Sequence, residues 1–424
     1  MIQYLGPSQV RPFAPPGKTI WNDRLAIVSS RVATMERQSR IRKEPVKMSQ
    51  ENCTWVGMDV HKKNIVVALM AATGSELEAW EVPNNRQGVR RLIKKLKAKQ
   101  SVRCCYEAGP CGFKLQRELV KAGLPCAVIA PSLIPTRSGD RVKTDRRDAK
   151  KLAKLYRADL LTEVHPPTEA EEAVRDLTRC REDAKADQKR ARHRLEKFLL
   201  RRGVRYGAGK KQWTLRYYQW LKSLKLDEPV AQQVFDDYLF QVEQQDARLA
   251  RLDEQIVDVS QQDPYKEQVG WLRCFRGIDT LTAMGYITEL FSIERFDTAR
   301  GLMAFVGQVP SESTSGDQVR RGGLTKTGNG HVRRLLTENA QHYRHHPAIG
   351  VGLKKRRQGQ PSWAISIADR AQRRLNHRYW HLVTKGKAHN KAISAVGREL
   401  VGFIWAALLE GQQRRANEAA GARQ

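Results

Sequence analysis

Cysteine is scarce in this 424-residue chain, and its pattern fits neither a metal site nor a disulfide framework. The seven cysteines are odd in number and include no Cys-x-x-Cys pair, which argues against structural zinc and against a secreted disulfide scaffold. Cys104 and Cys105 are adjacent within an apolar run and are interpreted as buried thiols. We therefore expect a reducing environment and a cytoplasmic protein.

Long apolar runs are also rare. Stretches such as Val401–Leu409 are too short to span a bilayer, and the N-terminal residues lack the apolar core of a secretory signal. We therefore expect no membrane partner.

Acidic residues are few relative to basic ones. The chain has 45 Asp and Glu against 76 Lys and Arg, which gives a formal net charge of +31 and a pI near 10.1. This charge predicts a polyanionic partner, and nucleic acid is the first candidate because each cation placed on a phosphate releases a counterion. An acidic membrane surface is the alternative. Against so basic a background, carboxylates gathered in one place need a chemical reason.

Residues 54–167 have the pattern of an α/β domain with a mixed sheet. Residues 1–53, rich in Pro, Arg and Gln, are expected to form a flexible basic extension, and Met48 could equally be the true start. The first two expected strands should pair as a hairpin around His61. Strands are expected at Thr54–Val60, Asn64–Met70, Glu76–Val82, Ser101–Tyr106 and Leu124–Ala130, and helices at Gln87–Lys99, Phe113–Ala122 and about Asp145–Ala158.

Residues 168–265 predict an antiparallel helical hairpin with heptad stripes, a coiled-coil region that would pack on itself or on a second subunit. Residues 266–410 are expected to form short helices and loops that end in an amphipathic helix near Lys391–Leu409. Residues 411–424 are expected to be a polar, disordered tail. The two stripes consist of Val174, Leu177, Ala184, Ala191, Leu195 and Phe198, and of Phe235, Tyr238, Val242, Leu249, Leu252, Ile256 and Val259.

Four acids are placed so that they could meet. Asp59 and Glu107 each end a predicted strand, and neighbouring strands would bring both carboxylates to one edge of the sheet. Asp145 and Asp148 are three positions apart and share a helix face. Four such oxygen donors suit a pair of Mg²⁺ ions that hold a phosphodiester for in-line attack. Alternatively, each acid is a solvated end-of-element residue, with Asp145 a helix N-cap.

Glycines and hydroxyls accompany these acids. Gly57 and Gly109 are expected to let a nucleic-acid backbone approach closely. Residues 311–316 are rich in hydroxyls and are interpreted as a flexible loop, where a serine would need a base or a metal for activation and cations to stabilise charge on phosphorus. The residues alone equally describe an ordinary loop beside a solvated basic face. The expected nucleic-acid-binding cations are Arg320, Arg321, Lys326, Arg333 and Arg334.

The histidines are not assigned to a metal. The C-terminal ones have no Cys or carboxylate at ligand spacing, so phosphate contacts or solvent exposure are expected instead. The histidines in question are His61, His331, His342, His345 and His346.

Six short motifs occur in a fixed order between Thr54 and Leu409. They are Gly57-Met-Asp-Val-His-Lys, Tyr106-Glu-Ala-Gly, Lys143-Thr-Asp-Arg-Arg-Asp-Ala, Phe305-Val-Gly-Gln-Val-Pro-Ser-Glu-Ser-Thr-Ser-Gly, Gly323-Leu-Thr-Lys-Thr-Gly-Asn and Val332-Arg-Arg-Leu-Leu. Together they resemble transposases of the insertion-sequence 110 family, relatives of the Piv/MooV DNA invertases.

The resemblance implies a RuvC/RNase H-like N-terminal domain, a coiled-coil middle region and a mainly α-helical C-terminal transposase domain with a catalytic serine. It also implies a noncoding bridge RNA as a guide, and a dimer or tetramer in which acids and serine come from different protomers. The implied catalytic, metal-binding acids are Asp59, Glu107, Asp145 and Asp148.

For the nucleophile, Ser315 matches the family best because it directly precedes Gly316. Gln308 and Ser313-Thr314 depart from the usual pattern, so Ser311, Ser313 and Thr314 remain alternatives.

The sequence therefore predicts a nucleoid-associated DNA transposase or site-specific recombinase. In this hypothesis Mg²⁺ on the acids activates Ser315, which attacks a DNA phosphate. The alternatives are a metal-dependent, structure-specific endonuclease that uses water, and a non-catalytic nucleic-acid-binding protein.

Overall fold

The computed structural model describes residues 53–71, 76–99, 101–136, 144–207, 210–315 and 318–421. The expected basic extension lies outside these ranges except for Cys53. The chain divides into two compact units, residues 1–165 and 166–424, and each is described by itself.

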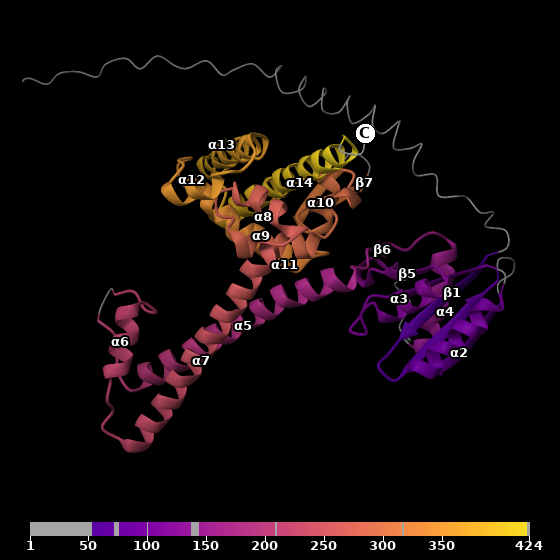
Figure 1. Ribbon diagram of the computed structural model, residues 1–424, viewed down its shortest axis with the longest axis horizontal. Helices are drawn as coiled ribbons and strands as arrows, with labels where there is room; N and C mark the ends of the chain where they lie inside the picture. The colour runs from indigo at the N-terminus through magenta and orange to yellow at the C-terminus, as the bar shows by residue number, and fades with distance from the viewer. Residues whose placement is uncertain are drawn as a thin grey trace, which may run out of the picture. The chain divides into compact units, whose positions relative to one another are not determined.

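The first unit is built on a six-stranded mixed sheet (Figure 1). Its strand order is β3-β2-β1-β4-β5-β6, in which β1, β2 and β3 form an antiparallel meander, β4 and β5 run parallel to β1, and β6 returns antiparallel. The expected hairpin and mixed sheet are confirmed. The strands are β1 (Thr54–Val60), β2 (Asn64–Met70), β3 (Leu77–Pro83), β4 (Val102–Glu107), β5 (Cys126–Ile129) and β6 (Glu163–Val164).

Helices cover both faces of this sheet. Because side chains alternate along β1, Val56 and Met58 pack with α2 (Arg86–Lys97) and α3 (Lys114–Lys121), whereas Trp55 packs with α4 (Asp145–Arg157) on the opposite face. A short 3₁₀ turn, Pro131–Leu133, follows β5. All three expected helices are present, with ends within two residues of the expected ones.

Gly57 is the point at which α4 comes closest to the sheet. A Cβ atom there would lie 2.3 Å from the carbonyl oxygen of Ala149 and 2.4 Å from the amide nitrogen of Ala153. Only glycine lets the backbone of the helix lie directly on the strand. The expectation that Gly57 leaves room for nucleic acid is therefore wrong, because α4 fills that space.

The second unit begins with the long helices α5 (Glu169–Arg201) and α7 (Pro229–Ser260), which lie side by side in Figure 1. Arg181 pairs with Asp253, Arg192 with Asp246, and Phe198 contacts Tyr238, so the partners run in opposite directions along the two helices. This confirms the antiparallel helical hairpin. Between them in the sequence lies α6 (Leu215–Ser223), whose buried side chains pack with those of α5 and α7.

The remaining chain forms a helical core. Its elements are α8 (Tyr265–Arg273), α9 (Thr280–Leu290), the 3₁₀ turn Ile293–Arg295, α10 (Ala299–Phe305), β7 (Pro310–Ser315), β8 (Gln318–Leu324), α11 (Gly330–Ala340), the 3₁₀ turn Gln341–Arg344, α12 (Val351–Arg357), α13 (Ser362–Thr384) and α14 (His389–Gly421). The loop expected at 311–316 is wrong for residues 311–315, because they form strand β7 and pair with β8. Residue 316 is outside the described ranges.

The last helix corrects one further expectation. It continues to Gly421, so residues 411–421 are helical rather than a disordered tail. It is also long and apolar enough to cross a membrane by length and composition, although half of the relevant window is buried inside the protein. Its buried residues, among them Leu400 and Ile404, belong to the main core of the second unit.

Candidate metal centre and serine hairpin

Two of the four predicted acids, Asp59 and Asp145, meet where α4 begins, next to the end of β1. Asp59 lies two residues beyond Gly57 on the same face of β1, and Asp145 lies one helical turn before Ala149. Because Gly57 brings this helix onto the strand, the first turn of α4 reaches the end of β1. The N-cap is Thr144, whose hydroxyl accepts the amide N–H of Arg147, so the alternative role of Asp145 as N-cap is wrong.

One histidine lies between the two carboxylates. The Nε2 atom of His61 is 3.3 Å from Oδ2 of Asp59 and 3.6 Å from Oδ2 of Asp145. One ligand atom from each of these three residues lies within 4.8 Å of the others. We call Asp59, His61 and Asp145 the acidic cluster. Asp148, one turn further along α4, is close enough to act electrostatically on Asp59.

This arrangement shifts the pKa of Asp59. Partial burial raises the pKa of Asp59 above its ordinary value, the negative charges of Asp145 and Asp148 raise it further, and His61 opposes them. Burial of a carboxylate beside like charges costs free energy that a cation can recover. Carboxylate oxygens and imidazole nitrogens are also common ligands of divalent metals, so the donor set fits such an ion.

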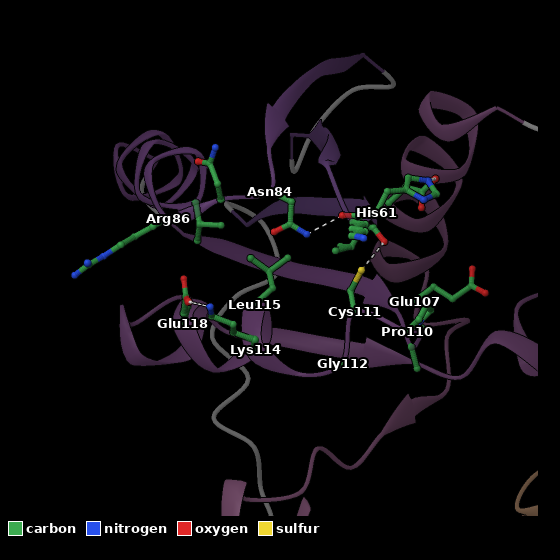
Figure 2. Close-up of a pocket in the computed structure, with 17 residues that line it drawn as sticks. His61, Asn84, Arg86, Glu107, Pro110, Cys111, Gly112, Lys114, Leu115 and Glu118 are labelled. Carbon is green, nitrogen blue, oxygen red and sulfur yellow. Dashed lines mark hydrogen bonds and ion pairs between the residues drawn. The ribbon is translucent and has the colours of Figure 1, made fainter. Parts of the chain in front are cut away.

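Glu107 reaches the same edge of the sheet but not the cluster. Met58 pairs with Tyr106, so Asp59 and Glu107 are the next residues on adjacent parallel strands. Glu107 is exposed and lines a hollow of about 1050 Å³ together with Asp59 and His61 (Figure 2). Among the described residues, the group of three whose positions would allow them to hold a metal ion does not include it. The same hollow is lined by the cations Lys62, Arg86 and Lys114.

Sequence reasoning missed the position of His61. Asp-x-His at the end of a strand is the available signal, because residues two apart share a face of a strand. That signal becomes informative only when a second element supplies another carboxylate to the same face. Here Asp145 does so from the start of α4.

The predicted serines lie on the β7–β8 hairpin of the second unit, whose base is held tightly. The backbones of residues 305–309 and 325–329 are joined by hydrogen bonds from Thr325 N to Val309 O (2.9 Å), Lys326 N to Gly307 O (3.1 Å) and Asn329 N to Phe305 O (3.1 Å). Gly307 and Gly328 both have positive φ, and a Cβ atom on either would collide with the opposing backbone. The two glycine-containing motifs therefore form one interlocked base.

A buried carboxylate attaches this base to the helices behind it. Glu289, at the end of α9, accepts two hydrogen bonds from Arg179 at 2.7 and 3.0 Å and one from Asn329 at 2.7 Å. Burial alone would raise the pKa of Glu289, but the hydrogen bonds from Arg179 and Asn329 outweigh it and hold the pKa below its ordinary value. Glu289 thus links α5, α9 and the N-cap of α11.

The hydroxyl residues project from this base. Ser311, Ser313 and Thr314 are exposed, and Ser315 is the last residue of β7, with a side chain that the structure does not describe. In the strand register, Ser313 lies opposite Arg320.

The five predicted nucleic-acid-binding cations have different environments. Arg320 and Lys326 are exposed, and the structure does not describe the side chain of Arg321. Arg333 donates to the carbonyl of Val306 at 3.0 Å, and Arg334 pairs with Glu182 and Glu338. The last two therefore also have partners within the protein.

Comparison with known proteins identifies the class of enzyme. Residues 56–202 match the DEDD transposase model of the IS110 group, and residues 271–350 match the model described as "Transposase IS116/IS110/IS902 family". The chain is a DNA transposase.

Two relatives fix the family more closely. The chain is 40% identical over 362 residues to "Putative transposase y4qE" of Sinorhizobium fredii, which covers 85% of this chain and 89% of that protein. It is 36% identical over 343 residues to "Transposase for insertion sequence element IS1533" of Leptospira borgpetersenii, which covers 78% of this chain and 97% of that protein. The chain therefore belongs to the IS110 family of transposases.

Proposed function

We propose that this transposase cleaves and exchanges DNA strands with a serine nucleophile that depends on divalent metal held by Asp59, Asp145, Asp148 and Glu107. One observation carries the proposal. Asp59 and Asp145 come from separate elements, and their carboxylate oxygens lie close enough together to bind the same metal ion. Glu107 would complete the site by turning its exposed side chain from the adjacent strand end.

The metal that we propose is Mg²⁺, which would polarise the scissile phosphate and ease ionisation of the attacking hydroxyl. In the cleavage step, the oxygen of Ser315 would bond to phosphorus and give its proton to water. The bond from phosphorus to one strand oxygen would break, and that oxygen would take up a proton and leave as a hydroxyl group. The phosphate is then esterified to the serine, which preserves a bond for the later strand exchange. Ser311, Ser313 and Thr314 are the alternatives for the nucleophile.

The remaining residues are assigned by their surroundings. Exposed Arg320 and Lys326, with Arg321, Arg333 and Arg334, are proposed to contact nucleic-acid phosphates. The net charge of +31 suits polyanionic partners, and we propose a bridge RNA as one of them besides DNA.

The family's domain scheme is proposed for this chain as well. A RuvC-like domain at 54–167 is supported by the antiparallel meander followed by two strands parallel to β1. A coiled coil at 168–265 is supported by the antiparallel pairing of α5 and α7, and it is the candidate contact for a dimer or tetramer. Residues 266–410 would form the transposase domain.

A covalent intermediate tests this function. A plasmid that carries the gene with its native flanks is incubated with the full-length protein and Mg²⁺, and protein bound to DNA is isolated under denaturing conditions. We expect a DNA-linked peptide at Ser315, no link in Ser315→Ala, and at least about a 10²-fold loss of cleavage in Asp145→Asn. Cleaved DNA without attached protein would contradict the serine mechanism.

A further inference from the structure

The half-exposed imidazole of His61 lies inside the acidic cluster, a position that the four-acid scheme leaves unused. We propose that His61 is a nitrogen ligand of the metal ion shared by Asp59 and Asp145, and that this ligand raises the affinity of the site for Mn²⁺ more than its affinity for Mg²⁺. The proposal rests on the proposed metal centre and adds a ligand and a metal preference to it.

The backbone of His61 is fixed before any ion binds. His61 lies in the β1–β2 turn, where its N–H donates to the carbonyl of Asn64 at 2.9 Å. The side-chain amide of Asn84 donates to the carbonyl of His61 at 2.7 Å (Figure 2). The backbone N–H of Asn84 donates to the carbonyl of Lys63. The turn is thus tied to the segment that precedes α2. A ligand on so well held a backbone needs little ordering when an ion arrives.

The distances within the cluster suit a shared ion. Ligands about 2.1 Å from an octahedral metal lie about 3.0 Å apart when adjacent and about 4.2 Å apart when opposite. His61 Nε2 lies 3.3 and 3.6 Å from the two carboxylate oxygens, between these limits. A charge-assisted N–H···O⁻ hydrogen bond would be shorter, about 2.7–2.9 Å. The spacing is therefore compatible with metal ligands that adjust slightly on binding, and His61 also pairs directly with Asp59.

The imidazole nitrogen determines which metal ion gains binding affinity. Mg²⁺ prefers an all-oxygen shell and gives up water reluctantly, whereas transition metals gain affinity from a nitrogen donor. His61 should therefore strengthen Mn²⁺ binding much more than Mg²⁺ binding.

Mn²⁺ binding by the full-length protein tests this ligand through a readout other than activity. Electron spin echo spectroscopy of the wild-type complex should show coupling between Mn²⁺ and ¹⁴N. In His61→Ala we expect that coupling to vanish, Mn²⁺ affinity to fall at least about tenfold, and Mg²⁺ affinity to fall less. His61 is half-exposed, so the variant should keep the wild-type unfolding temperature.

Lys62→Ala is the matched control, because Lys62 is the exposed cation next in the same turn. It should keep the ¹⁴N coupling and bind Mn²⁺ no more weakly than the wild type. If His61 were only a counterion, His61→Ala would bind Mn²⁺ as tightly as the wild type or more tightly, which would overturn the proposal. A wild-type protein that binds no Mn²⁺ would instead refute the metal centre itself.

Discussion

At the scale of single residues, buried side chains hold the serine-bearing β7–β8 hairpin in place. Glu289 is the clearest example, because one carboxylate joins Arg179 on α5 to Asn329 at the start of α11. A buried charge is stable only while its partners remain, so the network rigidly positions the base of the serine hairpin.

Glu289→Gln should lower the free energy of unfolding at neutral pH by about 2–3 kcal/mol, because the charge-assisted hydrogen bonds are lost. The pKa of Glu289 is lower in the folded protein than its ordinary value of 4.5. Once the pH falls below about 4.5, the unfolded state therefore binds more protons than the folded state. The stabilisation is therefore full above that pH and is lost as the pH falls through the lower folded value.

Urea unfolding across this pH range checks the prediction. The difference in the free energy of unfolding between wild type and variant should become smaller as the pH falls. Glu338→Gln is the control, since Glu338 is an exposed acid paired with Arg334 and should change stability by less than about 1 kcal/mol. A gap that stays constant down to pH 3 would contradict the assigned ionisation of Glu289.

Among secondary-structure elements, α4 decides whether the acidic cluster forms. Its first turn carries Asp145 and Asp148, and its position depends on the backbone contact at Gly57. The proposed metal centre should therefore depend on this helix–strand contact as well as on its own ligands.

Gly57→Ala should destabilise the protein by about 2–3 kcal/mol and weaken Mn²⁺ binding, because the added methyl group must push α4 off β1. Gly109→Ala is the matched control, since a Cβ there meets only the carbonyl oxygen of Glu107 at 3.9 Å. Thermal unfolding and Mn²⁺ titration measure both effects. Wild-type stability and affinity in Gly57→Ala would contradict the role given to this contact.

The sequence predicted the elements of the first unit well because their apolar patterns are regular. It could not predict how α4 crosses β1, since Gly57 by itself does not reveal which backbone approaches it. His61 was missed for the same reason, because its second carboxylate comes from a distant part of the chain.

In the second unit, β7 was missed because Ser311, Glu312, Ser313 and Thr314 show no apolar alternation. The strand forms through pairing with β8 above the interlocked base. The end of α14 was missed because its final turns are polar and largely exposed, so they carry no stripe that marks a helix.

For the molecule as a whole, the proposed chemistry is divided between two units. The first holds the acidic cluster, and the second holds the serine-bearing β7–β8 hairpin, whose base is attached to buried Glu289. The proposed mechanism requires that the cluster bind a divalent ion, since only then would a serine from the other unit, in the same or another protomer, be activated.

Anomalous diffraction from crystals of the full-length protein soaked in Mn²⁺ tests that requirement most directly. We predict a peak within about 2.3 Å of carboxylate oxygens of both Asp59 and Asp145, and no such peak in Asp145→Asn crystals. A wild-type crystal saturated with Mn²⁺ that shows no peak between these two residues would contradict the account.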